Sequence, residues 1–393
     1  MTLPLEGIRV LDLSRYLPGP YCTQILADFG AEVIKVEDPR GGDLGRNIVP
    51  MIGDLSARFY AVNRNKKSIT VDLKKEEGKE IFRKLVANSD VVVDQFRPGV
   101  MDKMGLGYEC LKAINDRIIY CSITGYGLNG PLRDAAGHDL NYLSLAGVTE
   151  LNGTFQGMPA MCAVQIADVA GGSLYAVIAI LMALASREKT GQGQLCDIAM
   201  MDGSVSLLAY TLAESSGWGS LPVRGDEVLT GGYAFYNIYK TKDNKHVSLG
   251  ALEDKFWADF CKKIGREEYI KMQWDKSQQD AIKADISKLM MEKTRDEWVE
   301  FFSDSDICFT PVLTLDEMCQ YPQVAARDMI YKLQNVGGLG KEIVATGIPM
   351  KLSATPGEVK LTFPKLGENN AEILQAAGYS AADIEELKKN KII

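Results

Sequence analysis

The hydrophobic positions of the first third of the chain fall into short apolar runs that alternate with amphipathic helical patterns. Apolar and β-branched runs predict strands at residues 8–13, 32–37, 68–73, 90–93 and 117–124. Between the third and fourth runs, LKKEEGKEIFRKLVANS carries apolar residues at helical spacing. Strands that alternate with helices indicate βαβ units, so the pattern predicts an α/β fold with a parallel sheet.

Residues 169–186 carry no charge and are almost numerous enough to span a membrane. The stretch contains Gly171, Gly172 and Ser173, and no second segment of the chain resembles a span. We therefore interpret it as a buried core helix and predict no association with a membrane. The segment GQGQLCDIAM that follows predicts a further strand.

The composition changes near residues 217–226, GWGSLPVRGD, where Gly, Pro and polar residues replace the periodic pattern. This change indicates a connection between two domains, which a chain of 393 residues is long enough to form. Beyond the connection, residues 233–250 alternate around a turn at 242–244 and predict a hairpin. Helical patterns then continue to about residue 320.

Charge and cysteine usage narrow the class of protein. The 44 basic and 52 acidic side chains leave a net charge of −8, which argues against binding to nucleic acid or to an anionic membrane. The eight cysteines form no C-x-x-C pair, and the N-terminus lacks the pattern of a signal peptide. We expect a reduced cytoplasmic protein without structural disulfides. Because the only histidines are His138 and His246, we predict no histidine-rich metal site.

The segment Gly125–Gly130 matches G-x-G-x-x-G directly after a predicted strand. In dinucleotide-binding folds these glycines open a helix, whereas Pro131, Asp134 and Gly137 continue the loop here. We interpret the segment as a glycine-rich loop at the carboxyl end of a strand. Such loops are where α/β folds bind ligands.

Three side chains are candidates for proton chemistry. Asp168 begins the long apolar helix, where a carboxylate either caps free amides or faces a bound molecule across small neighbours. His138 follows the glycine-rich loop and precedes a helix start, so it is a candidate acid–base group, although single histidines are often structural. Glu253 either caps the helix that begins beside it or orients an imidazole.

These segments together resemble the family III CoA-transferase superfamily, and within it the α-methylacyl-CoA racemase branch. The resemblance runs nearly from end to end. Its most specific pieces are AGHDLNYLSLAGV, ADVAGGSLYAVIAILMAL, KTGQGQ and GGYAFYNIYKTKDNKHVSLGALEDKFW, with FRPGVMDKMGLG and LGENNAEIL in support.

The resemblance implies the roles of the candidate side chains. In racemases of this kind the histidine of the GHD segment and the aspartate of the AD segment are the acid–base pair, and these match His138 and Asp168. The glutamate near that histidine matches Glu253. In the transferase members the matching aspartate is a covalent nucleophile, and an aromatic residue usually replaces the histidine. The CoA part of the substrate is implied to lie along two segments and two arginines: Thr70, Val71, Asp72 and Leu73; Ala136, Gly137, Asp139, Leu140 and Asn141; Arg40 and Arg97.

The resemblance also implies the architecture. The large domain is a Rossmann-like α/β domain with a parallel sheet, made from residues 1–216 and 330–393, and residues 217–229 form a linker. Residues 230–329 form a smaller α+β domain, and two chains form an interlocked homodimer. CoA enters as part of the substrate, and no separate cofactor is expected.

Two departures from the racemase pattern bear on the reaction. Residues 40–65 form a longer insert that resembles the transferase branch, and Asp38 stands where racemases place an arginine. Phosphate binding is therefore expected to shift to Arg40 or to another cation. The sequence predicts racemisation of 2-methylacyl-CoA thioesters, with CoA transfer between carboxylic acids through Asp168 as the alternative. A noncatalytic acyl-CoA-binding protein is a third possibility, but it would have little use for all three site residues.

Overall fold

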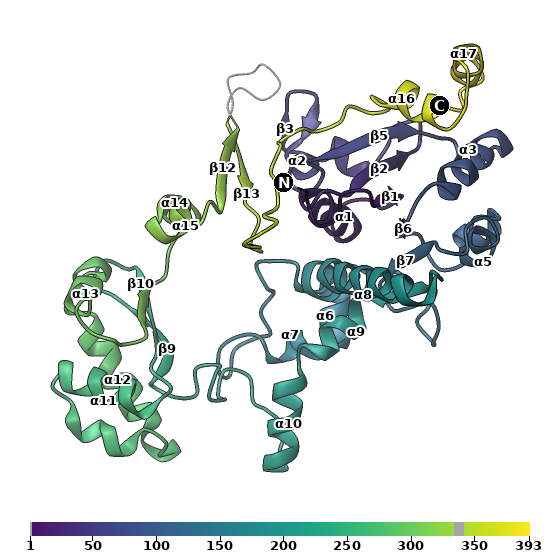
Figure 1. Cartoon of the computed structure of the whole chain (residues 1–393). Coiled ribbons are helices and arrows are strands. Elements are labelled where there is room, and N and C mark those ends of the chain that lie inside the picture. The colour runs from purple at the N-terminus through teal and green to yellow at the C-terminus, as the bar shows by residue number, and fades with distance from the viewer. Residues whose placement is uncertain (1, 334–341) are drawn as a thin grey trace. The chain divides into compact units, whose positions relative to one another are not determined.

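The computed structural model describes residues 2–333 and 342–393. The chain divides into two compact units, and each is described by itself. The large unit contains residues up to 146, 164–207 and 322–393, and the small unit contains residues 147–163 and 208–321. Figure 1 shows the elements of both units along the chain.

A six-stranded parallel sheet is the centre of the large unit. Its spatial order is β5-β2-β1-β6-β7-β8, and every neighbouring pair is parallel. The strands are β1 (Arg9–Asp12), β2 (Glu32–Glu37), β5 (Lys66–Thr70), β6 (Val91–Asp94), β7 (Ile119–Thr124) and β8 (Leu195–Ala199). The order is that of a Rossmann fold, with the direction of winding reversing between β1 and β6. The predicted strands are thus confirmed, with boundaries that differ from the predicted ones by at most four residues.

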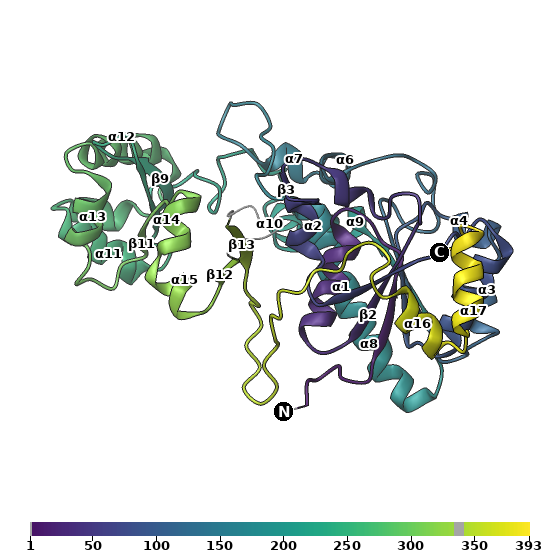
Figure 2. The ribbon, with the colours of Figure 1, turned by 90° about the horizontal axis from the view of Figure 1, so that it is seen from above.

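Helices cover both faces of this sheet (Figure 2). On one face, α3 inserts Ile81, Phe82 and Leu85 into a core that includes Leu11 of β1 and Ile69 of β5. The helices of this face are α3 (Glu76–Ala87), α4 (Val100–Lys103), α5 (Tyr108–Lys112), α16 (Asn370–Ala376) and α17 (Ala381–Lys389). The other face carries α1 (Pro18–Asp28), which contacts both the sheet and the long apolar helix.

The apolar stretch forms one continuous helix of 24 residues, Ala167–Thr190. Its first part is the π-helical segment η2 (Ala167–Leu174), and α8 (Tyr175–Thr190) continues it. By length and composition this is the one helix among the described residues that could cross a membrane, which is weak evidence by itself. It packs against α1, β7 and β8, but only 39% of its most apolar window is buried, so the expectation of a buried core helix is only partly met.

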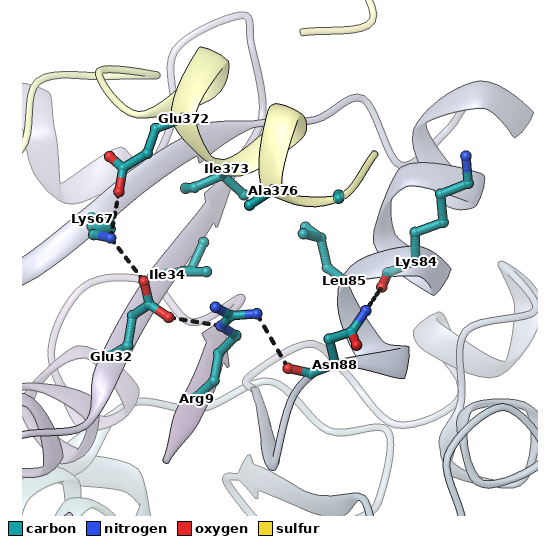
Figure 3. A pocket seen from close by; sticks show the side chains of 11 residues that line it. Arg9, Glu32, Ile34, Lys67, Lys84, Leu85, Asn88, Glu372, Ile373 and Ala376 are labelled. Atoms are coloured by element: carbon teal, nitrogen blue, oxygen red, sulfur yellow. Dashed lines mark hydrogen bonds and ion pairs between the residues drawn. The ribbon is translucent and has the colours of Figure 1, made fainter. Parts of the chain in front are cut away.

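The carboxyl-terminal part of the large unit completes the outer edge of the sheet. β5 is an edge strand, and Asn369 and Asn370 accept hydrogen bonds from the backbone amides of Ser68 and Thr70 at 3.0 and 2.8 Å. Lys67 bridges Glu32 and Glu372 at 2.8 and 2.6 Å beside a small pocket (Figure 3). Side-chain amides thereby satisfy a strand edge that would otherwise be open to pairing.

The remaining elements of the large unit are short. They comprise η1 (Leu44–Asn47), β3 (Met51–Ile52), β4 (Leu55–Ser56), α2 (Ala57–Val62), α6 (Asp139–Leu145), α9 (Met200–Ser206), α15 (Pro322–Ala326), β12 (Ile330–Leu333) and β13 (Ile343–Thr346). β3 pairs with β4, and β12 pairs with β13, each pair antiparallel.

The small unit has an antiparallel sheet of order β11-β10-β9 and its own aromatic core. The predicted hairpin is confirmed as β9 (Tyr236–Lys240) and β10 (His246–Gly250), with Asn244 at positive φ in its turn. The other elements are α7 (Val148–Leu151), α10 (Ala209–Trp218), α11 (Asp254–Lys263), η3 (Glu267–Met272), η4 (Lys276–Gln278), α12 (Gln279–Met290), α13 (Arg295–Phe301), β11 (Phe309–Pro311) and α14 (Leu315–Gln320). Trp257, Phe260 and Phe302 stack in its core.

The two units have boundaries that differ from the predicted division into domains. Spatial contacts assign residues 147–163 and 208–229 to the small unit, whereas the predicted division assigned them to the large domain or the linker. The predicted linker is helical at its start, because α10 continues through Trp218.

Candidate active site

The predicted ligand-binding residues of the large unit gather at the carboxyl edge of the parallel sheet. Arg40 comes after β2, and Thr70 is the last residue of β5, with residues 71–73 directly behind it. Arg97 comes after β6, and residues 136–141 come after β7. Parallel strands present all their carboxyl ends at one edge, so segments far apart in the sequence meet there. This edge is the candidate site.

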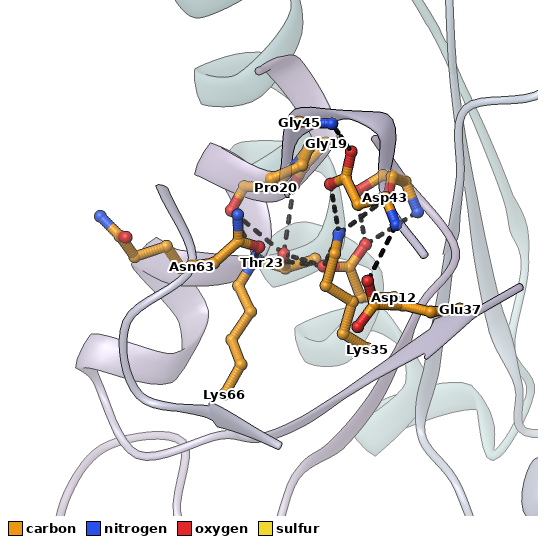
Figure 4. Close-up of polar contacts among 12 residues, drawn as sticks. Asp12, Gly19, Pro20, Thr23, Lys35, Glu37, Asp43, Gly45, Asn63 and Lys66 are labelled. Atoms are coloured by element: carbon orange, nitrogen blue, oxygen red, sulfur yellow. Dashed lines mark hydrogen bonds and ion pairs between the residues drawn. The ribbon is translucent and has the colours of Figure 1, made fainter. Parts of the chain in front are cut away.

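A fully buried ionic network lies beneath this edge (Figure 4). Asp12, at the end of β1, is within 3.8 Å of Lys35 and 3.1 Å of Lys66, and none of the three side chains is exposed. Burial alone would raise the pKa of Asp12, but the two ammonium groups and the hydroxyls of Ser14 and Thr23 hold it well below its usual range. The carboxyl group of Asp12 is therefore ionised although it is fully buried.

The network fixes the turn that follows β1. The backbone amide of Ser14 donates to Asp12 at 2.9 Å, and Lys35 donates to the carbonyl oxygen of Ser14 at 2.8 Å. The next residue is Arg15, whose guanidinium lies 5.0 Å from the ring centre of Phe96. Together with Val71 and Leu73, these two side chains line a narrow groove of about 40 Å³ at the carboxyl edge. Glu37, Asp38 and Asp43 also line this groove, and its volume holds only a few water molecules rather than an aromatic base. The stacked pair of Arg15 and Phe96 is what this part of the edge offers to an anionic ligand.

Other predicted residues of this region already have protein partners. Thr70 exchanges hydrogen bonds with Asn370, and the amide of Asp72 donates to the carbonyl oxygen of Ile392. The guanidinium of Arg40 donates to both carboxylate oxygens of Asp38 at 2.8 and 2.7 Å and to Asp72 at 3.3 Å. A phosphate at Arg40 would compete with these carboxylates, so its predicted role in phosphate binding stays a prediction.

The insert at residues 40–65 is anchored by buried ion pairs. Arg46 binds Glu37 through two hydrogen bonds of 2.6 and 2.7 Å, Asp43 lies 3.0 Å from Lys35, and Arg64 lies 2.6 Å from Asp28. Only Asp28, Lys35 and Glu37 of these residues lie outside the insert, and all three belong to α1 or β2. The insert is thus built into the sheet.

The glycine-rich loop after β7 is shaped by Tyr142. A Cβ at Gly125 or Gly137 would come within 2.5 or 2.6 Å of its ring, so both positions require glycine. The Tyr142 hydroxyl donates to the carbonyl oxygen of Gly137 at 2.5 Å, and its ring meets Tyr126 edge-on at 5.2 Å. The interpretation as a loop at the carboxyl end of a strand is confirmed.

His138 stands at the start of α6, as predicted, with an exposed imidazole. Its backbone amide donates to the side chain of Asn141 at 3.0 Å, which closes the first turn. Asn141 is therefore engaged in capping, while Ala136 and Leu140 are exposed beside it. The side chain of the adjacent Asp139 has a partner within the protein. Its carboxylate accepts a hydrogen bond of 3.0 Å from the backbone amide of Asp168.

Asp168 is half-buried in the first turn of η2. Burial, with a smaller contribution from the charge of Asp139, raises the pKa of its carboxyl group to about 7. Burial, with the charges of Asp168 and Asp139, also raises the pKa of Tyr142 to about 12. Asp168, Asp139 and Tyr142 are thus close neighbours, and Arg97 opposes the shift at Tyr142 from the turn after β6.

Close backbone packing holds the Asp168 segment in place. Gly171 and Gly203 meet so closely that a Cβ on Gly203 would lie 2.3 Å from the carbonyl oxygen of Gly171. Ser173 donates to the carbonyl oxygens of Pro18 and Asp168 at 2.7 and 3.1 Å. The predicted helix is confirmed, but its start is π-helical.

Of the two interpretations of Asp168 left open by the sequence, the structure does not support the capping one. The carboxylate of Asp168 caps no backbone amide among the described residues, because Asp139 fills that role from another helix. The backbone amides of Asp168 and Val169 are not free to hold an enolate oxygen, because they donate to Asp139 and to the carbonyl oxygen of Gln165.

Glu253 belongs to the small unit, where it is the exposed residue just before α11. The favoured interpretation, that its carboxylate caps this helix, is wrong, since the side chain makes no cap hydrogen bond. Its role in orienting His138 stays a prediction. Among the described residues, no group of three or more His, Cys, Asp or Glu side chains is arranged to hold a metal ion.

Sequence reasoning missed Arg15, Phe96, Tyr126 and Tyr142. Arg15 and Phe96 could have been found, because each follows a predicted strand by two or three residues and so reaches the carboxyl edge. The two tyrosines left no such signal, since their contact depends on how the loop after β7 folds back.

Sheets of this strand order bind ligands at the carboxyl edge, and His138, which follows β7, lies there with Asp168 linked to its helix through Asp139. The chain belongs to CoA-transferase family III, because the family model matches residues 5–370.

Relatives of two activities are similar to the whole chain. The human alpha-methylacyl-CoA racemase is 34% identical over 394 residues, which cover 100% of this chain and 98% of the racemase. An acyl-CoA transferase of Fusarium pseudograminearum (strain CS3096) is 34% identical over 406 residues, which cover 99% of this chain and 88% of that protein. The crystal structure of a CAIB/BAIF family protein from Brucella suis has a TM-score of 0.82 at 33% identity, and covers 96% of this chain and 100% of that one. A racemase and an acyl-CoA transferase are thus identical to this chain at the same share of positions.

Proposed function

We propose that this protein is a racemase that interconverts (R)- and (S)-2-methylacyl-CoA thioesters through an enolate. The observation that carries the proposal is the half-buried carboxyl group of Asp168, whose pKa is raised to about 7, linked through Asp139 to the helix that starts at His138. Acid–base groups work best when their pKa lies near the operating pH.

The proposed reaction uses the two side chains on opposite faces of the α-carbon. It starts with a neutral imidazole at His138 and a protonated carboxyl group at Asp168. The imidazole removes the α-proton, the electron pair moves into the thioester to form an enolate, and Asp168 delivers its proton to the other face. The product leaves an imidazolium and a carboxylate, which is the protonation state that the reverse reaction requires.

The CoA part of the substrate is proposed to lie along the carboxyl edge of the sheet. Arg15 stacks on the ring of Phe96 at this edge, and Arg97 is exposed nearby without an ion-pair partner among the described residues. Coenzyme A would then be bound as part of the substrate.

CoA transfer between carboxylic acids is the second candidate, and the transferase-like insert favours it. There the Asp168 carboxylate would attack the thioester carbonyl and release CoA as a thiolate, which gives a mixed anhydride. The thiolate would attack the aspartyl carbonyl, release the first acid and leave an aspartyl-CoA thioester. This route needs an ionised Asp168, and a raised pKa keeps part of that carboxyl group protonated at neutral pH.

Isotope exchange tests the proposal. Incubation with one enantiomer of a 2-methylacyl-CoA in deuterated water should give the opposite enantiomer with deuterium at the α-carbon, whether or not a carboxylic acid is added. Mass spectrometry follows the deuterium and chiral chromatography follows the enantiomers. Rapid CoA transfer to an added acid without α-exchange would instead establish the transferase.

We further propose that two chains form an interlocked homodimer. Large apolar side chains are exposed on α8, with Ile178 44% and Met182 68% exposed, and on α10, with Trp218 82% exposed. Monomers rarely leave extensive apolar surface uncovered. We expect sedimentation to show a dimer that does not dissociate on dilution to micromolar concentration. A concentration-dependent monomer in that range would contradict interlocking.

A further inference from the structure

The turn after β6 contacts three separate parts of the candidate site. The side chain of Gln95 accepts a hydrogen bond of 3.2 Å from the amide of Gly19, in the first turn of α1. Phe96 lies under Arg15 in the groove, and Arg97 acts electrostatically on Tyr142. The course of this one turn therefore decides where a ring and a cation stand at the carboxyl edge.

Asp94 fixes that course from below. Its carboxylate is buried and accepts three hydrogen bonds, from the amide of Phe96 at 2.6 Å, the hydroxyl of Tyr120 at 2.9 Å and the hydroxyl of Ser122 at 3.3 Å. Tyr120 and Ser122 belong to the neighbouring strand β7, so the carboxylate ties the turn to the sheet. The bond to Phe96 is short, as charge-assisted hydrogen bonds are.

We propose that Asp94 is a positioning residue for CoA-ester binding, which holds Phe96 and Arg97 in place through the turn that they form. The inference rests on the proposed use of the carboxyl edge as a CoA site. Asp94 itself does not line the groove, so its effect must pass through the turn.

Calorimetric titration with coenzyme A tests this role in the full chain. Asp94→Asn keeps the shape of the side chain but removes its charge, and should weaken CoA binding by about three- to tenfold. Asp102→Asn, which changes a nearby carboxylate on α4, is the matched control and should leave the affinity unchanged. In a Phe96→Ala/Arg97→Ala background, Asp94→Asn should weaken binding by less than about twofold, because the groups it positions are gone.

The pH dependence of the affinity for CoA distinguishes a positioning role of Asp94 from a merely structural one. Burial raises the pKa of Asp94 to about 6, and the groups that face it are Tyr120 and Cys121 on β7 and Asp102 on α4. As the pH falls from 7 to 5, protonation removes an acceptor, so wild type should lose more CoA affinity than Asp94→Asn. The ligand's own phosphates titrate equally with both proteins.

The outcomes separate this inference from the proposed function. Equal CoA affinity and equal pH dependence in wild type and Asp94→Asn would overturn the positioning role while leaving the CoA site intact. The positioning role would also be overturned if Asp94→Asn weakened CoA binding as much in the Phe96→Ala/Arg97→Ala background as in the wild type. Failure of wild type to bind coenzyme A would contradict the proposed function itself. If Asp94→Asn does not fold, Ser122→Ala replaces it, with an expected loss of at least about twofold; an unchanged affinity would again overturn the role.

Discussion

Replacing either His138 or Asp168 with alanine is expected to lower the interconversion of 2-methylacyl-CoA enantiomers by about 10²- to 10⁴-fold. General acid–base groups typically contribute that much, and each group serves one face of the α-carbon. Each single variant should still exchange the α-proton of one enantiomer with solvent, because the remaining base reaches its own face. Deuterium incorporation, measured separately for the (R)- and (S)-substrates, gives this signature.

His246→Ala is the matched control, since it removes the only other histidine, which is exposed on β10. It should leave racemisation unchanged. In a transferase, Asp168→Ala would abolish CoA transfer while His138→Ala would reduce it only mildly. A wild type that transfers CoA without α-exchange, together with a fully active His138→Ala variant, would exclude the racemase.

Asp12→Ala is expected to destabilise the large unit by about 3–5 kcal/mol, because it leaves the buried ammonium group of Lys66 without a counter-charge. Lys35 would retain Asp43, but Lys66 would keep only the carbonyl oxygen of Pro20 and the side chain of Asn63. Chemical denaturation followed by circular dichroism measures the loss as a shift of the large unit's transition.

Glu372→Ala is the control for this experiment, since it breaks a half-exposed ion pair with Lys67. Exposed pairs contribute only about 0–1 kcal/mol. The Asp12 pKa is lowered by folding, so its stabilising effect is present at neutral pH and declines below about pH 4, the usual pKa of an unfolded aspartate. The difference in the free energy of unfolding between wild type and Asp12→Ala should therefore become smaller in acid. An Asp12→Ala variant as stable as Glu372→Ala would show that the network contributes little.

The sheet could be predicted from the sequence because its signals are local. Apolar runs such as 90–93 identify a buried strand without knowledge of any neighbour, and the helix between two runs makes the pairing parallel. The charges inside that sheet could not be predicted. Lys35 alternates with apolar residues in EVIKVE, where a lysine is expected to face solvent, and only the fold brings Asp12 and Asp43 to it.

The candidate site was predictable in its residues and less so in its geometry. The position of His138 before a helix start, with Asp168 at another, follows from periodicity and resemblance. The bond from Asp168 to Asp139 joins residues 29 positions apart through a π-helical start, and no local pattern indicates either feature. Glu253 shows the same limit, because its position before α11 was predictable and its missing cap was not.

The hydrogen bonds between β5 and the side chains of Asn369 and Asn370 can form only late in the synthesis of the chain. The amide of Thr70 finds its acceptor in Asn370, 300 residues further along the chain. At about 5–20 residues per second, a ribosome needs roughly 15–60 s to supply that partner. Throughout this interval the outer edge of β5 is open to strands of other chains, and the groove beside Leu73 lacks part of its support. A nascent chain is therefore most vulnerable to aggregation at this edge before Asn369 and Asn370 have been synthesised.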